Sequence, residues 1–135
     1  MSPQEKQVVQ ALETYLLDFN RHDIAAIKSF FSCPLMLIMP QGGPTCLTSE
    51  EQIGGSFSAI LEGLLSNGFT HSHWQDMSIK LLTDTCALAS TVVVRFKGEG
   101  VELERLGATY TLCNQGHGWQ VTTLVAHSPD SVLKF

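Results

Sequence analysis

Two histidines and a carboxylate lie close together in the segment Thr70–Asp76, which reads THSHWQD. Imidazole and carboxylate groups at this spacing could share a metal ion or work as an acid/base pair. In a β-strand, however, successive side chains point to opposite faces, which puts His71 and His73 on one face and Asp76 on the other. The apparent cluster is then divided between two faces, and we expect no metal site.

The aliphatic residues of this strand indicate which face points into the core. From Phe69 onward, the odd-numbered positions carry the aliphatic side chains Met77, Ile79 and Leu81. His71 and His73 share these positions, so both are expected to face inward unless a β-bulge changes the register. Trp74 and Asp76 are then expected to face outward.

Strand alternation in two later segments predicts that one more histidine and a tyrosine face inward. Near the C-terminus, Trp119 and His127 share the more apolar set of positions with Val121 and Val125, so both are expected to face inward. Tyr110 also lies on the more apolar side of its strand. Its phenol would then need a buried partner.

Arg95 and Lys97 precede a hairpin whose second strand carries Glu102 and Glu104. If Arg95 lies opposite Glu104 and Lys97 opposite Glu102, two cross-strand ion pairs account for all four charges. A pairing shifted by one residue sends Arg95 and Tyr110 to opposite faces. Both registers stay open, and Arg95 is a candidate ligand-binding residue.

Two capping boxes mark the starts of the longer helices. Ser2-Pro3-Gln4-Glu5 predicts a first helix over about residues 3–19, and Thr48-Ser49-Glu50-Glu51 opens a third helix. Asp23 can cap a shorter helix between them. The third helix has one apolar face at helical spacing, made of Ile53, Phe57, Ile60, Leu61 and Leu64.

The remaining segments have the pattern of strands. Residues 33–39 form a buried strand that ends at Pro40 and Gly42-Gly43-Pro44. After Asn67-Gly68 the period changes to about two. Four strand-like segments follow, at residues 69–82, 86–97, 102–113 and 119–127. Short joints favour hairpins, so we predict an α+β fold with three N-terminal helices on a strongly curved, mainly antiparallel sheet.

This order of elements resembles the nuclear transport factor 2-like, or SnoaL-like, superfamily. Two segments add to the match: LDFNRHDIAAIKSFF (17–31) is similar to the entry segment of that superfamily, and GATYTLCNQGHGWQVTTLVAH (107–127) to its closing hairpin. The resemblance covers nearly the whole chain. It implies a single SnoaL-like domain over residues 1–135, with the cystatin-like cone that ketosteroid isomerase also has, in a subfamily of unknown function.

The composition of the chain argues against nucleic acid and membrane as binding partners. The net charge of -5 and pI near 5.4 argue against nucleic acid, which requires clustered basic residues. The longest apolar run, residues 35–39, is too short to span a membrane, and the N-terminal residues lack the apolar region of a signal peptide, so we expect a cytoplasmic protein. The cysteines lack the close pairing of a zinc ribbon or a redox motif; they are Cys33, Cys46, Cys86 and Cys113.

The resemblance implies an apolar pocket between the third helix and the concave sheet face. There His73 or His127 could act as the base and Tyr110 could donate a hydrogen bond to a developing enolate oxygen. Such a site suits cofactor-independent isomerisation, cyclisation or dehydration of a small carbonyl compound. The expected ligand contacts are His71, Arg95, Phe57 and Trp119.

Residues 35–39 offer no Asp where an isomerase-like base is expected, which argues against a mechanism of the ketosteroid isomerase type. The alternative class is a non-catalytic binding or dimerisation module of the same fold. Homodimers through the sheet are common in the superfamily, and an outward Trp74 near Thr91–Val94 would suit such an interface.

Overall fold

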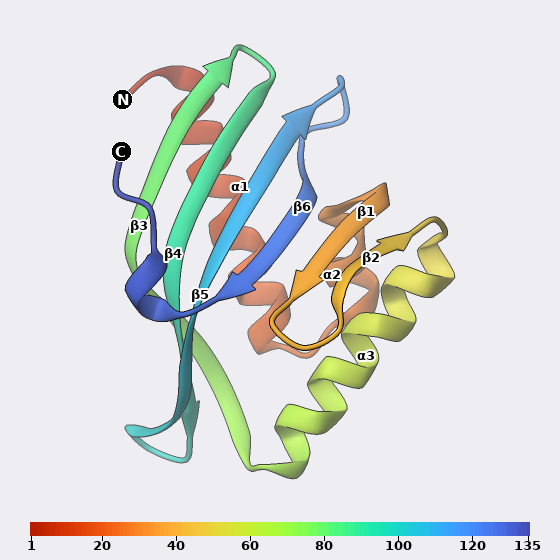
Figure 1. The fold of residues 1–135 in the computed structure, drawn as a ribbon, viewed down its shortest axis with the longest axis vertical. Coiled ribbons are helices and arrows are strands. Elements are labelled where there is room, and N and C mark those ends of the chain that lie inside the picture. The colour runs from red at the N-terminus through yellow and green to blue at the C-terminus, as the bar shows by residue number, and fades with distance from the viewer.

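The chain folds into three α-helices and a six-stranded sheet, described by a computed structural model of residues 1–135 (Figure 1). The helices are α1 (Pro3–Asn20), α2 (Ile24–Ser29) and α3 (Glu50–Ser66), with a 3-10 turn, η1, at Pro129–Ser131. The strands are β1 (Phe31–Met39), β2 (Gly43–Leu47), β3 (Phe69–Thr83), β4 (Cys86–Lys97), β5 (Val101–Asn114) and β6 (Trp119–His127). None of the helices has the length and apolar composition that crossing a membrane requires.

The strands follow the order β2-β1-β6-β5-β4-β3, and every neighbouring pair is antiparallel except β1 and β6, which are parallel. The predicted α+β class and curved sheet are confirmed. Strand β2 is an addition: the first strand is predicted to end at Pro40 and Gly42-Gly43-Pro44, but the chain turns back there and β2 pairs with β1. Pro44 is tolerated there because β2 is an edge strand.

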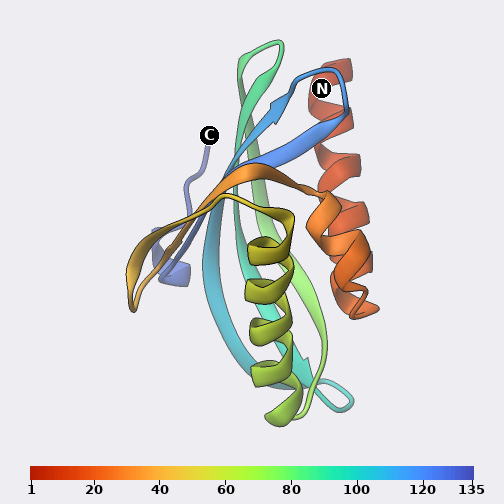
Figure 2. The same cartoon turned by 90° about the vertical axis from the view of Figure 1, so that its right-hand side faces the viewer.

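The helices lie on one face of the sheet and the C-terminal segment on the other (Figures 1 and 2). The Ser2 hydroxyl accepts a hydrogen bond from the Glu5 N–H while the Glu5 carboxylate accepts one from the Ser2 N–H, so the predicted capping box starts α1. Helix α1 then buries side chains three or four residues apart, namely Val8, Leu12, Tyr15 and Phe19.

A side chain at the end of α1 fixes that helix to β3. The Asn20 amide donates to the Ser72 carbonyl at 3.0 Å, and its oxygen accepts from the Ser72 N–H at 2.7 Å. This pair of bonds satisfies backbone groups at the free edge of the sheet, since β3 is an edge strand. It also holds Tyr15 and Phe19 above the concave face.

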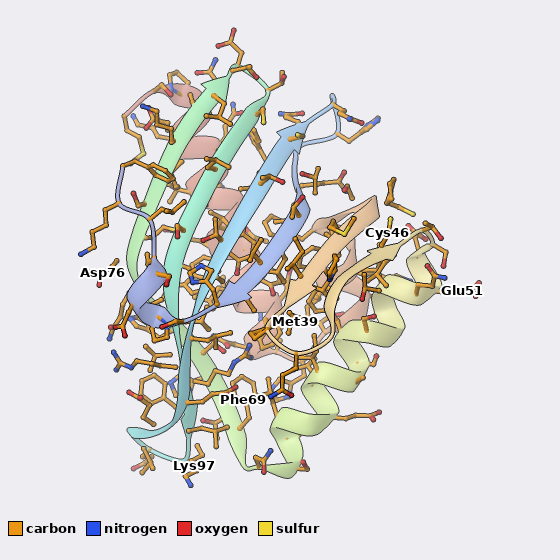
Figure 3. All side chains as sticks on the ribbon, viewed as in Figure 1. Met39, Cys46, Glu51, Phe69, Asp76 and Lys97 are labelled. Carbon is orange, nitrogen blue, oxygen red and sulfur yellow. The ribbon has the colours of Figure 1, made fainter.

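β-Bulges interrupt the strands that carry the candidate histidines, and three of them affect the faces on which those histidines lie. In β3, extra residues fall between Phe69 and His71 and between Gln75 and Ser78, and in β6 one falls at Thr122. Asp76 forms part of the second bulge with a φ of 55°, and it lies at the outer edge of the sheet (Figure 3). Each bulge moves the side chains that follow it to the opposite face.

The C-terminal segment crosses the convex face of the sheet beyond β6 (Figure 2). The Leu133 N–H donates to the Ser90 hydroxyl and the Phe135 N–H donates to the Ser78 hydroxyl, both at 2.9 Å. Two hydroxyls on neighbouring strands therefore anchor the end of the chain.

Candidate functional site

An apolar cavity of about 70 Å³ lies between α1, α3 and the concave face of the sheet. Thirteen of its fifteen lining residues are hydrophobic, and the two others are Ser72 and Arg95. A few polar groups in an otherwise apolar concave wall are typical of small-molecule sites. The lining residues are Tyr15, Leu16, Phe19, Met39, Phe57, Ile60, Ser72, Trp74, Val93, Arg95, Leu106, Ala108, Tyr110, Leu124 and Ala126.

Arg95 brings a cation to this cavity from β4. Its Nε lies 3.1 Å from Oε1 of Glu104, close enough for an ion pair but without a hydrogen bond between them. The guanidinium carbon lies 5.4 Å from the ring centre of Phe19, a cation–π distance. Its Nη1 is buried and has no hydrogen-bond partner. Because the Arg95 side chain is only 13% exposed and the Glu104 side chain 50%, the cation is the buried member of the pair.

Two phenols, from Tyr15 on α1 and Tyr110 on β5, also line the cavity, and neither makes a hydrogen bond within the protein. Burial raises the pKa of both phenols above the ordinary value for tyrosine, and nearby Arg95 opposes this rise only in part. Both groups are therefore neutral hydrogen-bond donors at neutral pH.

Ser72 contributes the remaining polar group. Its side chain is buried and lines the cavity, while its hydroxyl oxygen has no hydrogen-bond partner. The backbone of Ser72 is held by Asn20, so the hydroxyl is positioned independently of any ligand.

The expected inward orientation of His71 and His73 is wrong. Both are exposed, whereas Ser72 and Trp74 between and after them line the cavity. The cause is the bulge near Asp76: Met77, Ile79 and Leu81 do pack on the core, but the residues before the bulge have the opposite phase. The expected outward orientation of Trp74 is wrong for the same reason.

His71 and His73 have little connection to the cavity. The His71 ring stacks on Phe96 with centroids 5.0 Å apart, and its Nδ1 lies 3.1 Å from the hydroxyl of Thr70. His73 makes no hydrogen bond through its side chain.

His127 also faces away from the cavity, contrary to expectation. The bulge at Thr122 leaves Trp119 and Val121 inward but turns Leu124 and Ala126, rather than His127, toward the cavity. The His127 ring lies over Gly107, where an added Cβ would collide with the imidazole and would lie 2.6 Å from the Ser128 carbonyl. Glycine at position 107 is thus required by this close approach.

A chain of hydrogen bonds holds His127 on the convex face. Its Nδ1 lies 2.7 Å from the Ser128 carbonyl, which can only accept, so Nδ1 carries the proton. In the neutral imidazole, Nε2 then accepts from the Thr109 hydroxyl at 2.7 Å, which leaves the Thr109 oxygen to accept from the Ser90 hydroxyl at 2.8 Å. These groups are fully occupied by one another.

Three of the candidate residues do meet at the cavity: Tyr110, Arg95 and Phe57. Trp119 is buried but lies outside it, and its indole N–H donates to the Gln7 side chain at 3.3 Å. Tyr15 and Ser72 also line the cavity, although neither is among the predicted site residues. Tyr15 lies on the buried face of α1, and its hydroxyl is the available signal in the sequence, since a buried phenol needs a partner.

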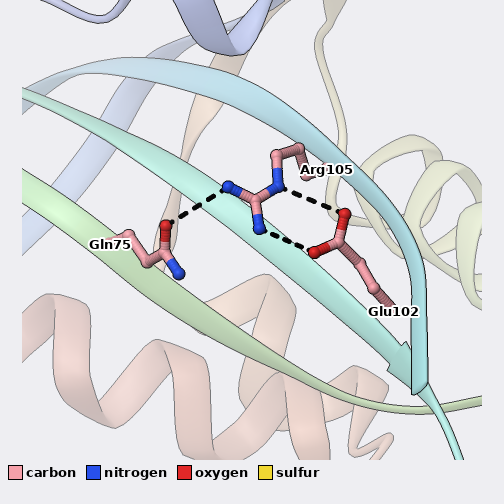
Figure 4. A network of polar contacts seen from close by, with 3 residues as sticks. All are labelled: Gln75, Glu102 and Arg105. Atoms are coloured by element: carbon pink, nitrogen blue, oxygen red, sulfur yellow. Dashed lines mark hydrogen bonds and ion pairs between the residues drawn. The ribbon is translucent and has the colours of Figure 1, made fainter. Parts of the chain in front are cut away.

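In the hairpin of β4 and β5, one of the two predicted ion pairs is present and the other is not. Arg95 lies opposite Glu104, as one of the two registers predicted. A bulge at Leu103 then places Lys97 opposite Val101, so the expected pair between Lys97 and Glu102 is wrong. Glu102 instead binds Arg105 through two hydrogen bonds, of 2.6 and 3.2 Å, and Arg105 reaches Gln75 on β3 (Figure 4).

The family is shown by comparison with known proteins. Residues 4–129 match the model of a family described as NTF2-like protein (DUF6841), so the chain belongs to that NTF2-like family. The predicted superfamily is confirmed. No curated protein has a matching sequence.

Solved structures share this fold at low sequence identity. An NTF2-like protein with a cystatin-like fold from Novosphingobium aromaticivorans has a TM-score of 0.77 at 11% identity, covering 95% of this chain and 83% of that one. Aln2 from a Streptomyces species has a TM-score of 0.75 at 17% identity, covering 96% and 94%. A ketosteroid isomerase-like protein from Erwinia carotovora atroseptica has a TM-score of 0.66 at 14% identity, covering 93% and 96%. These similarities establish the fold and not the activity.

Proposed function

We propose that this protein binds a small, largely apolar molecule in the cavity between α1, α3 and the concave sheet face. One observation carries the proposal: an apolar cavity contains a buried guanidinium nitrogen and a buried hydroxyl that have no partner in the protein. Buried polar groups are normally hydrogen-bonded, so unpaired ones that face a cavity are groups that a ligand would satisfy.

Binding is favoured over acid/base catalysis by the lining of the cavity. No imidazole or carboxylate is among the lining residues, and the two phenols are neutral. The cavity therefore supplies hydrogen-bond donors for a carbonyl or carboxyl oxygen but no base to remove a proton. The catalytic roles considered for His73 and His127 gain no support, because both side chains face away.

The two tryptophans allow a direct test. Trp74 lines the cavity and Trp119 lies outside it, so the two indole N–H signals in a ¹H–¹⁵N spectrum give a reporter and an internal control. Titration with hexan-1-ol should shift the Trp74 signal saturably and leave the Trp119 signal in place. A Trp119→Phe variant assigns the two signals.

Substitutions inside and outside the cavity test whether the shift of the Trp74 signal comes from binding in the cavity. Ala126→Leu should weaken binding because Ala126 lines the cavity, whereas Ala25→Leu on the exposed side of α2 should not. His73→Ala should also leave binding unchanged. No saturable change at Trp74, or equal effects of the two leucine variants, would refute the proposal.

A homodimer through the sheet, implied by the superfamily resemblance, is a second proposal. The expected support from Trp74 is lost, since that residue lies inside, and the C-terminal segment occupies part of the convex face. Native mass spectrometry at micromolar concentration should show twice the 14.8 kDa mass of one chain. A spectrum with the single-chain mass alone would exclude the dimer at that concentration.

A further inference from the structure

Arg95 lies at the junction of two hollows. Besides the inner cavity, it lines an outer groove of about 450 Å³ between α3 and the ends of β1 and β6. Both hollows also share Met39, Ile60, Leu106 and Ala126. A ligand that enters through the groove therefore meets the guanidinium before its apolar part reaches the inner cavity.

The guanidinium retains free donors at this junction. Only Nε approaches an acidic group, Glu104, and the two terminal nitrogens make no hydrogen bond in the protein. Two parallel N–H groups of a guanidinium match the two oxygens of a carboxylate, and such charge-assisted pairs are stronger than neutral hydrogen bonds. A neutral carbonyl oxygen can use only part of this geometry.

Neighbouring groups favour an acid over a base as the ligand head group. The phenols of Tyr15 and Tyr110 are neutral donors, the Ser72 hydroxyl is unpaired, and Glu104 is half exposed to solvent. No carboxylate lines the inner cavity, and Glu104, which lines the outer groove, is already paired with Arg95, so a cationic head group would meet the guanidinium without a free counter-charge.

The size of the inner cavity limits the apolar part. Its volume of about 70 Å³ is less than half of the roughly 150 Å³ that holds benzene in an engineered protein cavity. A flexible aliphatic chain can extend from this space into the adjoining groove, whereas a rigid aromatic ring cannot divide between the two.

We propose that the ligand is a short-chain aliphatic carboxylate whose head group pairs with the guanidinium of Arg95 and whose chain fills the inner cavity. The inference rests on the proposed function, because it assigns a chemical class to the ligand of the same cavity.

Three probes of matched length test the head group. Hexanoate, hexanamide and hexan-1-ol are titrated separately against the ¹⁵N-labelled protein near neutral pH, with the Trp74 indole signal as the reporter. Hexanoate should bind at least about tenfold more tightly than hexanamide, the difference expected between a charged pair and a neutral hydrogen bond.

Three substitutions then assign this preference to Arg95. Arg95→Gln should abolish the preference for hexanoate, and Arg95→Lys should retain only part of it, because an ammonium lacks the planar pair of donors. Glu104→Gln should strengthen hexanoate binding, since it removes the acid that competes for the guanidinium. The amide fingerprint of each variant shows that its fold is kept.

A matched control lies on the neighbouring strand. Arg105→Gln makes the same substitution on the convex face, where the side chain binds Glu102 and Gln75, and should leave the preference unchanged.

The two proposals fail differently. Equal binding of hexanoate and hexanamide, or equal effects of the two glutamine substitutions, would overturn the carboxylate assignment while leaving a small-molecule site. Absence of any Trp74 response to all three probes would overturn both.

Discussion

The concave and convex faces of the sheet differ in whether their buried polar side chains have hydrogen-bond partners. On the convex face, Ser90, Thr109 and His127 satisfy one another, and Thr111 lies 2.6 Å from the Thr122 hydroxyl. On the concave face, the Ser72 hydroxyl and a nitrogen of Arg95 are buried without hydrogen-bond partners. Both of these sets carry hydroxyl and nitrogen groups, but only for the set on the convex face does the protein supply the hydrogen-bond partners.

This contrast separates structural from ligand-binding polar groups. Buried hydrogen bonds between side chains contribute to stability, whereas an unpaired buried group costs free energy in the absence of a ligand. Histidines attract attention in a sequence because of their chemistry. Here, however, the geometry of hydrogen bonding favours the serine, arginine and tyrosines of the concave face as the ligand contacts.

Of the predicted changes in stability, the largest is the loss of unfolding free energy at alkaline pH. Tyr15 and Tyr110 are the only tyrosines of the chain, and burial raises the pKa of both in the folded state. The folded protein then holds these protons more tightly than the unfolded chain, so their stabilisation is complete below about pH 10 and is lost as the pH rises further. Once both phenols of the unfolded chain are deprotonated, above about pH 11, the free energy of unfolding should fall by about 2.7 kcal/mol per pH unit.

Denaturant unfolding between about pH 9 and pH 12 measures the onset of this loss and its full slope. Tyrosinate absorbance should appear only as the protein unfolds, and Tyr110→Phe should reduce the slope by about half. Normal titration of either phenol in the folded protein, near pH 10, would contradict the buried concave face.

A glycine substitution tests the convex face. Gly107→Ala should lower the free energy of unfolding by about 2 kcal/mol, because the new methyl group collides with the His127 ring and the Ser128 carbonyl. Gly55→Ala in α3 is the control: its Cβ meets no atom within 4 Å, so helix propensity should make it stabilising by up to about 1 kcal/mol. Equal signs for the two variants, measured by urea unfolding, would contradict this packing.

Two serines give the closest comparison of the faces, since both are buried and they lie on adjacent strands. Ser90→Ala should cost about 1–2 kcal/mol, because the Leu133 N–H and the Thr109 hydroxyl lose their partner. Ser72→Ala should change stability by less than about 0.5 kcal/mol, because its hydroxyl is unpaired. Comparable losses in thermal unfolding would show that both hydroxyls are structural.

The smallest expected change concerns the two arginines. Arg95→Met should raise the stability of the ligand-free protein by up to about 1 kcal/mol, since it removes a buried and incompletely paired cation. Arg105→Met should lower stability instead, because it breaks the contacts to Glu102 and Gln75. A loss of stability in both variants would indicate that Arg95 has a structural role.

Much of the fold could be predicted from local patterns. The predicted capping box starts α1, whereas α3 has Ser49 as its N-cap, one residue after the predicted Thr48, and the Ser49 hydroxyl accepts from the Gln52 N–H. The apolar spacing of each helix matches its buried face. Tyr110 was placed correctly because β5 alternates without interruption from Glu104 to Cys113. Where backbone pairing is regular, strand alternation identifies the inward side chains.

The histidines were misplaced because alternation does not reveal where one residue is added. The bulges near Asp76 and at Thr122 each reverse the faces of one part of a strand. On either side of a bulge the apolar and polar residues still alternate regularly, so the sequence pattern does not show where the reversal occurs. Asp76 offered one signal, since aspartate tolerates the positive φ that such a bulge can need. The site was therefore predicted at β5 and missed at β3 and β6.

The hydrogen bonds that run from Leu133 through Ser90 and Thr109 to His127 all point in one direction. Each hydroxyl accepts one hydrogen bond and donates another, so the amide of Leu133 is linked through two hydroxyls to the tautomer of an imidazole on β6. The tautomer of His127, read from the ¹⁵N chemical shifts of its ring, can therefore serve as a spectroscopic label for the docking of the C-terminal segment.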